Sequence, residues 1–337
     1  MPASAQPNHL PDKLELIDSG FIFQEAPFNS CHASTICGLP NGRLIAAWFG
    51  GTAEGNSDVS IWISTMTEGR WNAPKEVANG KQKNGIQFAC WNPVLFRNSK
   101  GLLFLFYKVG TSPRTWWGEM KTSTDDGVTW SQAHKLPNGF LGPIKNKPIR
   151  LNDGDILHPS STESEEDNTW KIHLERSDGE GNNWIKINID CDTFNVIQPT
   201  LITYPGDSMQ LLCRSRENLI AQSWSFDGGE TWGKVTHISL PNPNSGIDAV
   251  TLKSGLQLLV YNPLPPEKNW WEGRSILKVA ISKDGHSWKD VFTLENHNTG
   301  EYSYPAVVQS ADGSIHITYT YDRKYIKYVH LRVPNTF

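Results

Sequence analysis

The string STDDGVTW at 123–130 sets Ser, Asp and Thr at fixed spacing, and SFDGGETW at 225–232 nearly repeats it. Carboxylates and hydroxyls can take part in acid–base chemistry, so the phrase could be catalytic. A tight turn uses the same residues more simply. Asp accepts hydrogen bonds from the amides of its own turn, Gly permits a positive φ, and Trp wedges an apolar face between sheets. We therefore expect the phrase to be structural and the reacting groups to lie elsewhere.

The phrase returns along the chain at a nearly regular interval. Related Ser-to-Trp pairs frame STMTEGRW at 64–71, SDGEGNNW at 177–184 and SKDGHSW at 282–288. Successive copies begin 59, 54, 48 and 57 residues apart. A period of about fifty residues is the length of one four-stranded propeller blade.

Short apolar runs between the phrases predict strands. GRLIAAWFG, GLLFLFYKVG and GLQLLVYN are rich in β-branched and aromatic residues and follow turn residues. No segment shows a capped apolar stripe of helical period. We predict an all-β, six-bladed β-propeller over 15–337 after a tail at 1–14, with the sixth blade closed by strands from both termini, which removes exposed sheet edges.

The bulk properties exclude several partner classes. The 337 residues carry a net charge of −4 without a basic run, which argues against nucleic acid. No apolar stretch approaches the roughly 18 residues of a membrane span, and the N-terminus lacks a secretory h-region. The five cysteines fit no zinc pattern, and the histidines are too scattered for a metal site. We expect a cytoplasmic monomer with free thiols and no metal or cofactor; a secreted or periplasmic protein without its leader stays open.

Repeated boxes of this kind resemble the Asp boxes of the sialidase (neuraminidase) superfamily. The resemblance covers the chain from about residue 15 to 332. It implies a catalytic six-bladed propeller in which three arginines hold a substrate carboxylate. An Asp would be the acid/base, and a Tyr supported by a Glu the nucleophile.

The resemblance places two of the three arginines. Arg214 in LLCRSR stands close ahead of an Asp box, as the second arginine of the family does, and Arg216 follows two residues later. Arg274 in RSILKVAIS lies eight residues before the Ser of the next box, the position of the third. The position of the first arginine, in CHASTICGLP, is taken by His32.

The catalytic positions match in part. Tyr304 precedes the last Asp-Gly pair by eight residues, as the nucleophile does, whereas Gln198 stands where the supporting Glu is expected. The acid/base loop reads GGTAEGNSDVSIW and offers Glu54 and Asp58, between which the loop length does not decide. The resemblance thus implies a sialidase-like glycosidase with altered chemistry.

The chemistry of these residues favours an anionic sugar. Arg214 and Arg274 on neighbouring inner strands could clamp a carboxylate bidentately, so we expect a terminal sialic-acid-like ulosonate or a uronate as substrate. His32 and Gln198 would contact the sugar, and Tyr304 would attack the oxocarbenium-like centre or stabilise it. A Tyr with a free pKa of about 10 needs a base, and an amide cannot be that base.

Other groups could fill the missing roles. Glu301, Glu54 or His32 could take the proton of the Tyr. Lys145 or Lys147 in GPIKNKPI could supply the positive charge that a His largely lacks at neutral pH, and we include Lys147 among the substrate-binding candidates. Trp116 and Trp117 could stack on a sugar, and Glu163 could point toward the axis.

Two further functions fit the same residues. In a uronate-specific polysaccharide lyase, Tyr304 and His32 would serve as base and acid while the arginines neutralise the carboxylate. A non-catalytic carbohydrate-binding propeller is the other alternative, because a fold does not fix a function.

Overall fold

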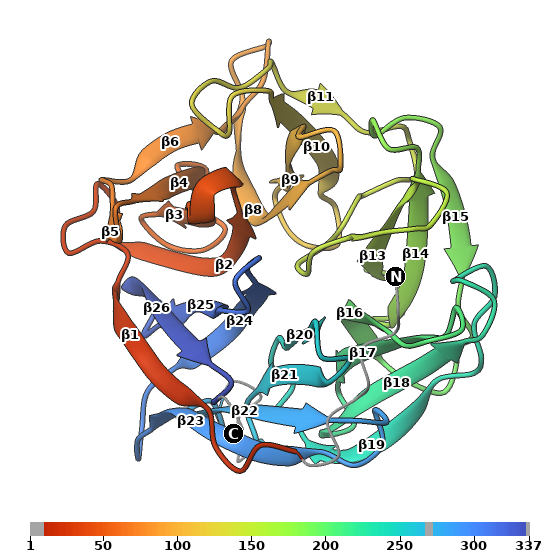
Figure 1. The fold of residues 1–337 in the computed structure, drawn as a ribbon. Coiled ribbons are helices and arrows are strands. Elements are labelled where there is room, and N and C mark those ends of the chain that lie inside the picture. Colours follow the sequence, from red (N-terminus) through yellow and green to blue (C-terminus); the bar gives the residue numbers. More distant parts are fainter. Residues whose placement is uncertain (1–9, 267–271, 335–337) are drawn as a thin grey trace.

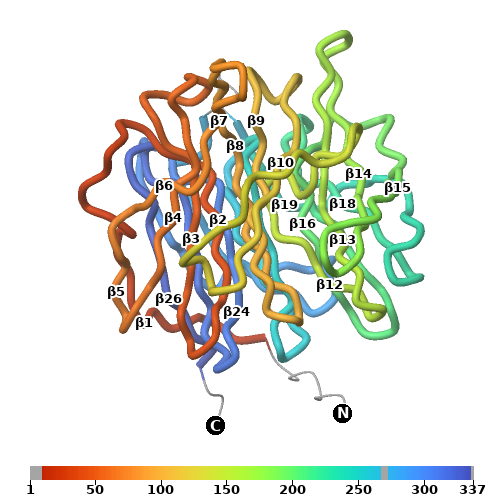
Figure 2. Tube along the Cα trace, turned by 90° about the horizontal axis from the view of Figure 1, so that it is seen from above, coloured from red at the N-terminus to blue at the C-terminus, as the bar shows by residue number. Residues whose placement is uncertain are grey.

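Six small antiparallel sheets stand around a central axis and form a six-bladed β-propeller, as the sequence predicts (Figure 1). The computed structural model describes residues 10–266 and 272–334. The long strands run between the two faces of the ring (Figure 2). Within these ranges the helical structure consists of one 3-10 turn, η1 (Pro40–Gly42), and no helix is long and apolar enough to cross a membrane.

The strands follow one another blade by blade. The first blade holds β2 (Ser30–Gly38), β3 (Leu44–Gly51), β4 (Ser60–Thr67), β5 (Arg70–Trp71) and β6 (Lys75–Ala78). The second holds β7 (Gly80–Lys81), β8 (Gln87–Arg97), β9 (Leu103–Gly110), β10 (Trp117–Ser123) and β11 (His134–Lys135). The third holds β12 (Ile149–Arg150), β13 (Ile156–Glu163), β14 (Trp170–Ser177) and β15 (Ile185–Asn188).

The second half of the ring repeats this order. The fourth blade holds β16 (Val196–Thr203), β17 (Met209–Ser215), β18 (Leu219–Ser225) and β19 (Thr236–Pro241). The fifth holds β20 (Asp248–Thr251), β21 (Gln257–Tyr261), β22 (Ile276–Ser282) and β23 (Lys289–Asn296). The sixth holds β24 (Tyr302–Gln309), β25 (Ile315–Tyr321), β26 (Tyr325–Arg332) and β1 (Glu15–Phe21).

The sixth blade closes the ring with strands from both ends of the chain. β1 pairs antiparallel with β26 from Glu15 opposite Arg332 to Phe21 opposite Lys327. Figure 1 shows these two strands side by side. The pairing unites both ends of the chain in one sheet and so closes the ring of six blades.

The Asp boxes form the turns that follow β4, β10, β14, β18 and β22. In the box at 123–130, the Asp125 carboxylate accepts bonds from the backbone N–H and the hydroxyl of Thr129, at 2.9 and 2.6 Å. The Trp130 Nε1–H donates to the carbonyl of Gly127 at 3.1 Å. The box at 225–232 repeats these bonds, and neither box lines the axial cavity described below. The phrase is therefore structural, as expected.

Replacing Asp125 by Ala should lower the melting temperature at neutral pH without changing activity. The hydrogen bonds from Thr129 lower the pKa of Asp125 to about 2. A pKa that is lower in the folded than in the unfolded state stabilises the fold at pH values above the unfolded-state pKa of about 3.9. This contribution to stability disappears as the pH falls toward about 2. The melting-temperature gap between wild type and variant, followed by Trp fluorescence, should narrow over that range. A gap that does not change with pH would contradict this assignment.

Candidate active site at the ring axis

β-Bulges interrupt the innermost strands at the end where a cavity opens. The pairing register shifts in β2, β8, β16 and β24. The bulges set residues in left-handed backbone conformation: Ala33 (φ 55°), Asn92 (φ 37°), Gln198 (φ 57°) and Tyr304 (φ 53°). Such backbone costs about 1–3 kcal/mol for a non-glycine residue and persists where the surrounding ladder enforces it. Bulges of this kind re-aim side chains, and three of the four residues line the cavity.

The cavity has a volume of about 600 Å³ and opens on the axis. The bulges form its inner wall, and much of its rim comes from the turns between the second and third strands of the blades. The lining includes the aromatic residues Trp91, Trp116, Trp170 and Tyr304, the arginines Arg114, Arg214 and Arg216, and the acids Glu54 and Glu163.

Arg214 on β17 is the cation on the inner wall. Its Nη1 donates to the Tyr304 hydroxyl at 2.6 Å and to Oε1 of Gln198 at 3.4 Å, and its Nε donates to Oδ1 of Asn244 at 2.9 Å. The side chain is 3% exposed, yet it reaches the cavity. Among the described residues, Arg214 forms hydrogen bonds with neutral groups only, so its charge stays available to an anion.

Arg274 lies directly behind Arg214 instead of beside the cavity. The two arginines meet at Asn244, whose side chain accepts from Arg214 and whose carbonyl accepts from Arg274 Nη2 at 3.1 Å. Arg274 Nη1 also forms an ion pair with Glu301 at 2.9 Å. The two arginines from different blades thus meet at Asn244, but of these two only Arg214 lines the cavity.

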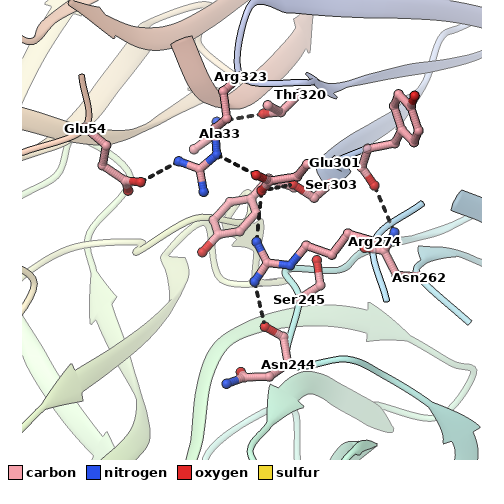
Figure 3. A network of polar contacts seen from close by, with 12 residues as sticks. Ala33, Glu54, Asn244, Ser245, Asn262, Arg274, Glu301, Ser303, Thr320 and Arg323 are labelled. Carbon is pink, nitrogen blue, oxygen red and sulfur yellow. Dashed lines mark hydrogen bonds and ion pairs between the residues drawn. The ribbon is translucent and has the colours of Figure 1, made fainter. Parts of the chain in front are cut away.

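An arginine that the sequence analysis does not include completes this network. Arg323 lies in the turn between β25 and β26, and its Nε donates to Glu301 at 2.9 Å while its Nη1 pairs with Glu54 (Figure 3). Burial would raise the pKa of Glu301, but the two arginines outweigh burial and hold that pKa below its ordinary value. Glu301 is thus an ionised anchor rather than a base for Tyr304.

His32 lies under the ring of Tyr304, with 4.1 Å between the two ring centroids. The imidazole is 1% exposed, and neither ring nitrogen has a hydrogen-bond partner among the described residues. Burial lowers its pKa well below the ordinary value, and the charges of Arg323, Arg274 and Arg214 act in the same direction. His32 is neutral at physiological pH, and the positive charge near it comes from the surrounding arginines, of which Arg323 acts most strongly.

Two more polar groups surround Tyr304. Gln198 Nε2 approaches the Tyr304 hydroxyl at 3.5 Å, and Gln198 lines the cavity. The Lys145 ammonium lies 5.9 Å from the centroid of the Tyr304 ring and donates to the carbonyl of Ile247 at 2.9 Å and to that of Pro305. Burial lowers the pKa of Lys145 to about 7.

The three candidate acids have different surroundings. Asp58 does not line the cavity, because its carboxylate accepts from the amide and hydroxyl of Thr52 at 2.8 and 2.7 Å. The hydroxyl bond holds its pKa low. Glu54 lines the cavity but is paired with Arg323. Burial raises the pKa of Glu163 above its usual value, although nearby arginines act in the opposite direction.

The remaining sequence candidates lie away from the inner wall. Lys147 forms an ion pair with the buried Asp248 at 2.9 Å and does not line this cavity. Trp116 lines the cavity, whereas the Trp117 indole donates to Glu119 at 2.9 Å. Within residues 10–266 and 272–334, no group of three or more His, Cys, Asp or Glu side chains is arranged to hold a metal ion.

Comparisons with known proteins agree with this architecture. Residues 42–317 match the family model described as BNR repeat-like domain. The anhydrosialidase of Macrobdella decora is 27% identical over 232 residues, which are 59% of this chain but only 29% of that protein.

Solved structures share the fold at low sequence identity. The NanB sialidase of Streptococcus pneumoniae superposes with a TM-score of 0.74 at 14% identity, over 93% of this chain and 70% of that one. A Dyadobacter fermentans protein described as of unknown function superposes with a TM-score of 0.77 at 15% identity, over 96% of this chain and all of that one. The chain belongs to the BNR repeat-like domain family and is a member of the sialidase-like superfamily.

Proposed function

We propose that the protein is a glycoside hydrolase that removes a terminal acidic sugar, a sialic-acid-like ulosonate or a uronate, from a glycan. The observation that carries the proposal is Arg214. This buried guanidinium reaches the cavity and donates its described bonds to neutral groups only. The similarity to the M. decora anhydrosialidase supports the same reaction class.

Each residue near the bound sugar has a chemical task in this proposal. Arg214 binds the carboxylate through charge-assisted hydrogen bonds, and Arg274 adds positive charge from behind. Tyr304, already bonded to Arg214, faces the anomeric carbon, and its hydroxyl oxygen stabilises the developing positive charge there. Cleavage breaks the glycosidic C–O bond as a general acid protonates the leaving oxygen. Water then gives its hydroxyl to the anomeric carbon and its proton to the carboxylate of that acid.

The proton for the leaving oxygen comes from Glu163 in this mechanism. A general acid must hold its proton at the working pH, and burial shifts the pKa of Glu163 in that direction. Asp58 is stabilised as an anion by Thr52 and does not line the cavity, and Glu54 is engaged in an ion pair with Arg323. Glu163 is therefore favoured over the two acids that the sequence offers.

The variant Glu163→Gln should lower kcat about 100-fold for a substrate with a poor leaving group, such as an alkyl glycoside. The loss should be much smaller for an aryl glycoside, whose leaving oxygen needs no proton. In the wild type, activity should fall as the pH rises through the raised pKa of Glu163. Michaelis–Menten kinetics on both substrates across pH test this.

Glu165→Gln is the matched control, because Glu165 is exposed in the loop that follows β13. This control should keep the activity and pH profile of the wild type. An equal loss of Glu163→Gln on both substrates would contradict the role of Glu163 as acid.

The contact of Tyr304 with Arg214 favours lyase chemistry as a second candidate, with Tyr304 as the base and Arg214 neutralising the carboxylate. A lyase would abstract the proton next to the carboxylate and expel the glycosidic oxygen, which leaves an unsaturated sugar. Incubation with fluorogenic sialosides, aryl uronides and polyuronates separates the two functions. We expect released aglycone without the ultraviolet absorbance of an unsaturated uronate. That absorbance would instead establish the lyase, and binding without turnover would contradict both.

A further inference from the structure

Two guanidinium groups from different blades share one amide oxygen at the mouth of the cavity. Arg114, in the turn after β9, donates through Nη2 to Oδ1 of Asn168 at 2.7 Å. Arg216, just after β17, donates through Nη2 to the same oxygen at 3.2 Å and through Nη1 to the Asn168 carbonyl at 2.7 Å. Both arginines line the same cavity as Arg214.

The electrostatics of this pair point to an anionic ligand. The side-chain hydrogen bonds of Arg114 and Arg216 go to Asn168, a neutral residue. Glu163 interacts electrostatically with both arginines and with Arg214, and Glu217 interacts with Arg216. Burial lowers the pKa of Arg216, the charges of Arg114 and Arg214 add to this, and Glu163 opposes it. Two like charges held this close repel each other, and a bound anion would relieve that repulsion.

The two cation positions are adjacent in the cavity. The Arg214 and Arg216 guanidinium groups lie 5.5 and 3.9 Å from the centroid of the same Trp170 ring. Arg214 belongs to β17, whereas Arg216 belongs to the turn that follows it. An anion at Arg216 would therefore lie beside the one that Arg214 holds, as the carboxylate of a neighbouring sugar would.

Aromatic rings give this outer position a sugar-binding surface. The Arg216 guanidinium stacks on Trp170, 3.9 Å from the ring centroid. Trp91 and Trp116 line the same cavity, with 6.0 Å between their ring centroids. Stacking on Trp170 fixes the guanidinium plane for bidentate contact with a carboxylate.

We infer that Arg114 and Arg216 form a second carboxylate-binding subsite, so that the preferred substrate is an acidic oligosaccharide whose penultimate residue is also acidic. This inference rests on the proposed function, because it assigns the outer subsite to the leaving group. Glu163 lines the same cavity as the arginines of both subsites. A proton donor to the bond between the two sugars has to lie in this position.

The test compares two substrates that carry the same terminal acidic sugar, one linked to a uronate and the other to the corresponding neutral sugar. The wild type should prefer the diacidic substrate about tenfold in kcat/KM. In the variant Arg114→Gln/Arg216→Gln this ratio should fall close to one. Arg332→Gln, an exposed arginine of β26, should keep the wild-type ratio.

A direct binding measurement separates failure of this inference from failure of the proposed function. Isothermal titration with a diuronate should give a dissociation constant about tenfold weaker for the double variant than for the wild type. Equal affinities, or equal preference ratios in turnover, would overturn the second subsite. Absence of turnover together with the expected affinity difference would contradict the hydrolase and leave the subsite supported. Circular dichroism verifies that both variants are folded.

Discussion

The variant Arg214→Met should lower kcat/KM for an acidic-sugar substrate about 1,000-fold. Arg214 is the buried guanidinium that reaches the axial cavity, and each charge-assisted hydrogen bond to a carboxylate contributes about 1.5–3 kcal/mol. Losing a bidentate contact therefore lowers kcat/KM by a factor of about 1,000. Since the carboxylate is bound in both ground and transition states, much of the loss should appear in KM.

Arg332→Met controls for the loss of an arginine as such. Arg332 lies on β26, where it pairs with Glu15 across the closing strands, so its replacement should leave the kinetics intact. Melting temperatures of both variants check that the fold is retained. Wild-type kinetics in a folded Arg214→Met variant would contradict the proposed carboxylate site.

The variant Tyr304→Phe should lower kcat about 1,000-fold with little change in KM. Phe keeps the ring that packs on His32 and fits the same bulge, but it removes the hydroxyl that accepts from Arg214 at 2.6 Å. A hydroxyl that attacks or stabilises the anomeric centre acts in the transition state, so its loss falls on kcat. Steady-state kinetics on an aryl glycoside measure the effect.

The matched control is Tyr261→Phe. The Tyr261 hydroxyl donates to Asp290 at 2.9 Å, and the residue does not line the cavity. Its replacement should leave kcat unchanged. If Tyr304→Phe retained kcat within a few-fold of wild type, Tyr304 would be a packing residue only and the mechanism would need another group.

The blade pattern can be predicted from the sequence because the Ser and Trp of the boxes act within their own turns. Even the less regular copies keep the bond from the Trp indole to the turn, at 2.9 Å from Trp184 to Gly181 and at 3.0 Å from Trp288 to Gly285. The first copy differs, since Trp71 packs against Tyr328 instead. The same local hydrogen bond recurs at the four later copies, so the period survives sequence drift.

The candidate site is only partly readable because it depends on contacts that are distant in the chain. Arg214, Tyr304, His32 and Gln198 converge because each has a fixed place on an inner or second strand. Arg323 resembles an ordinary turn residue in YDRKY, and it meets Glu54, 269 residues away in sequence, only after the ring closes. The bulges place non-glycine residues in left-handed backbone conformation, and the types of these residues do not indicate this in the sequence.

Binding of a sugar acid and of its methyl ester measures the central claim most directly. The ester keeps the shape of the sugar but removes the negative charge that Arg214 is proposed to bind. Isothermal titration of wild type and Arg214→Met with a sialic acid or a uronic acid and its ester gives four affinities. We expect the wild type to bind the acid about 100-fold more tightly than the ester, and the variant to bind both equally weakly. Equal affinity of the wild type for acid and ester would contradict the account.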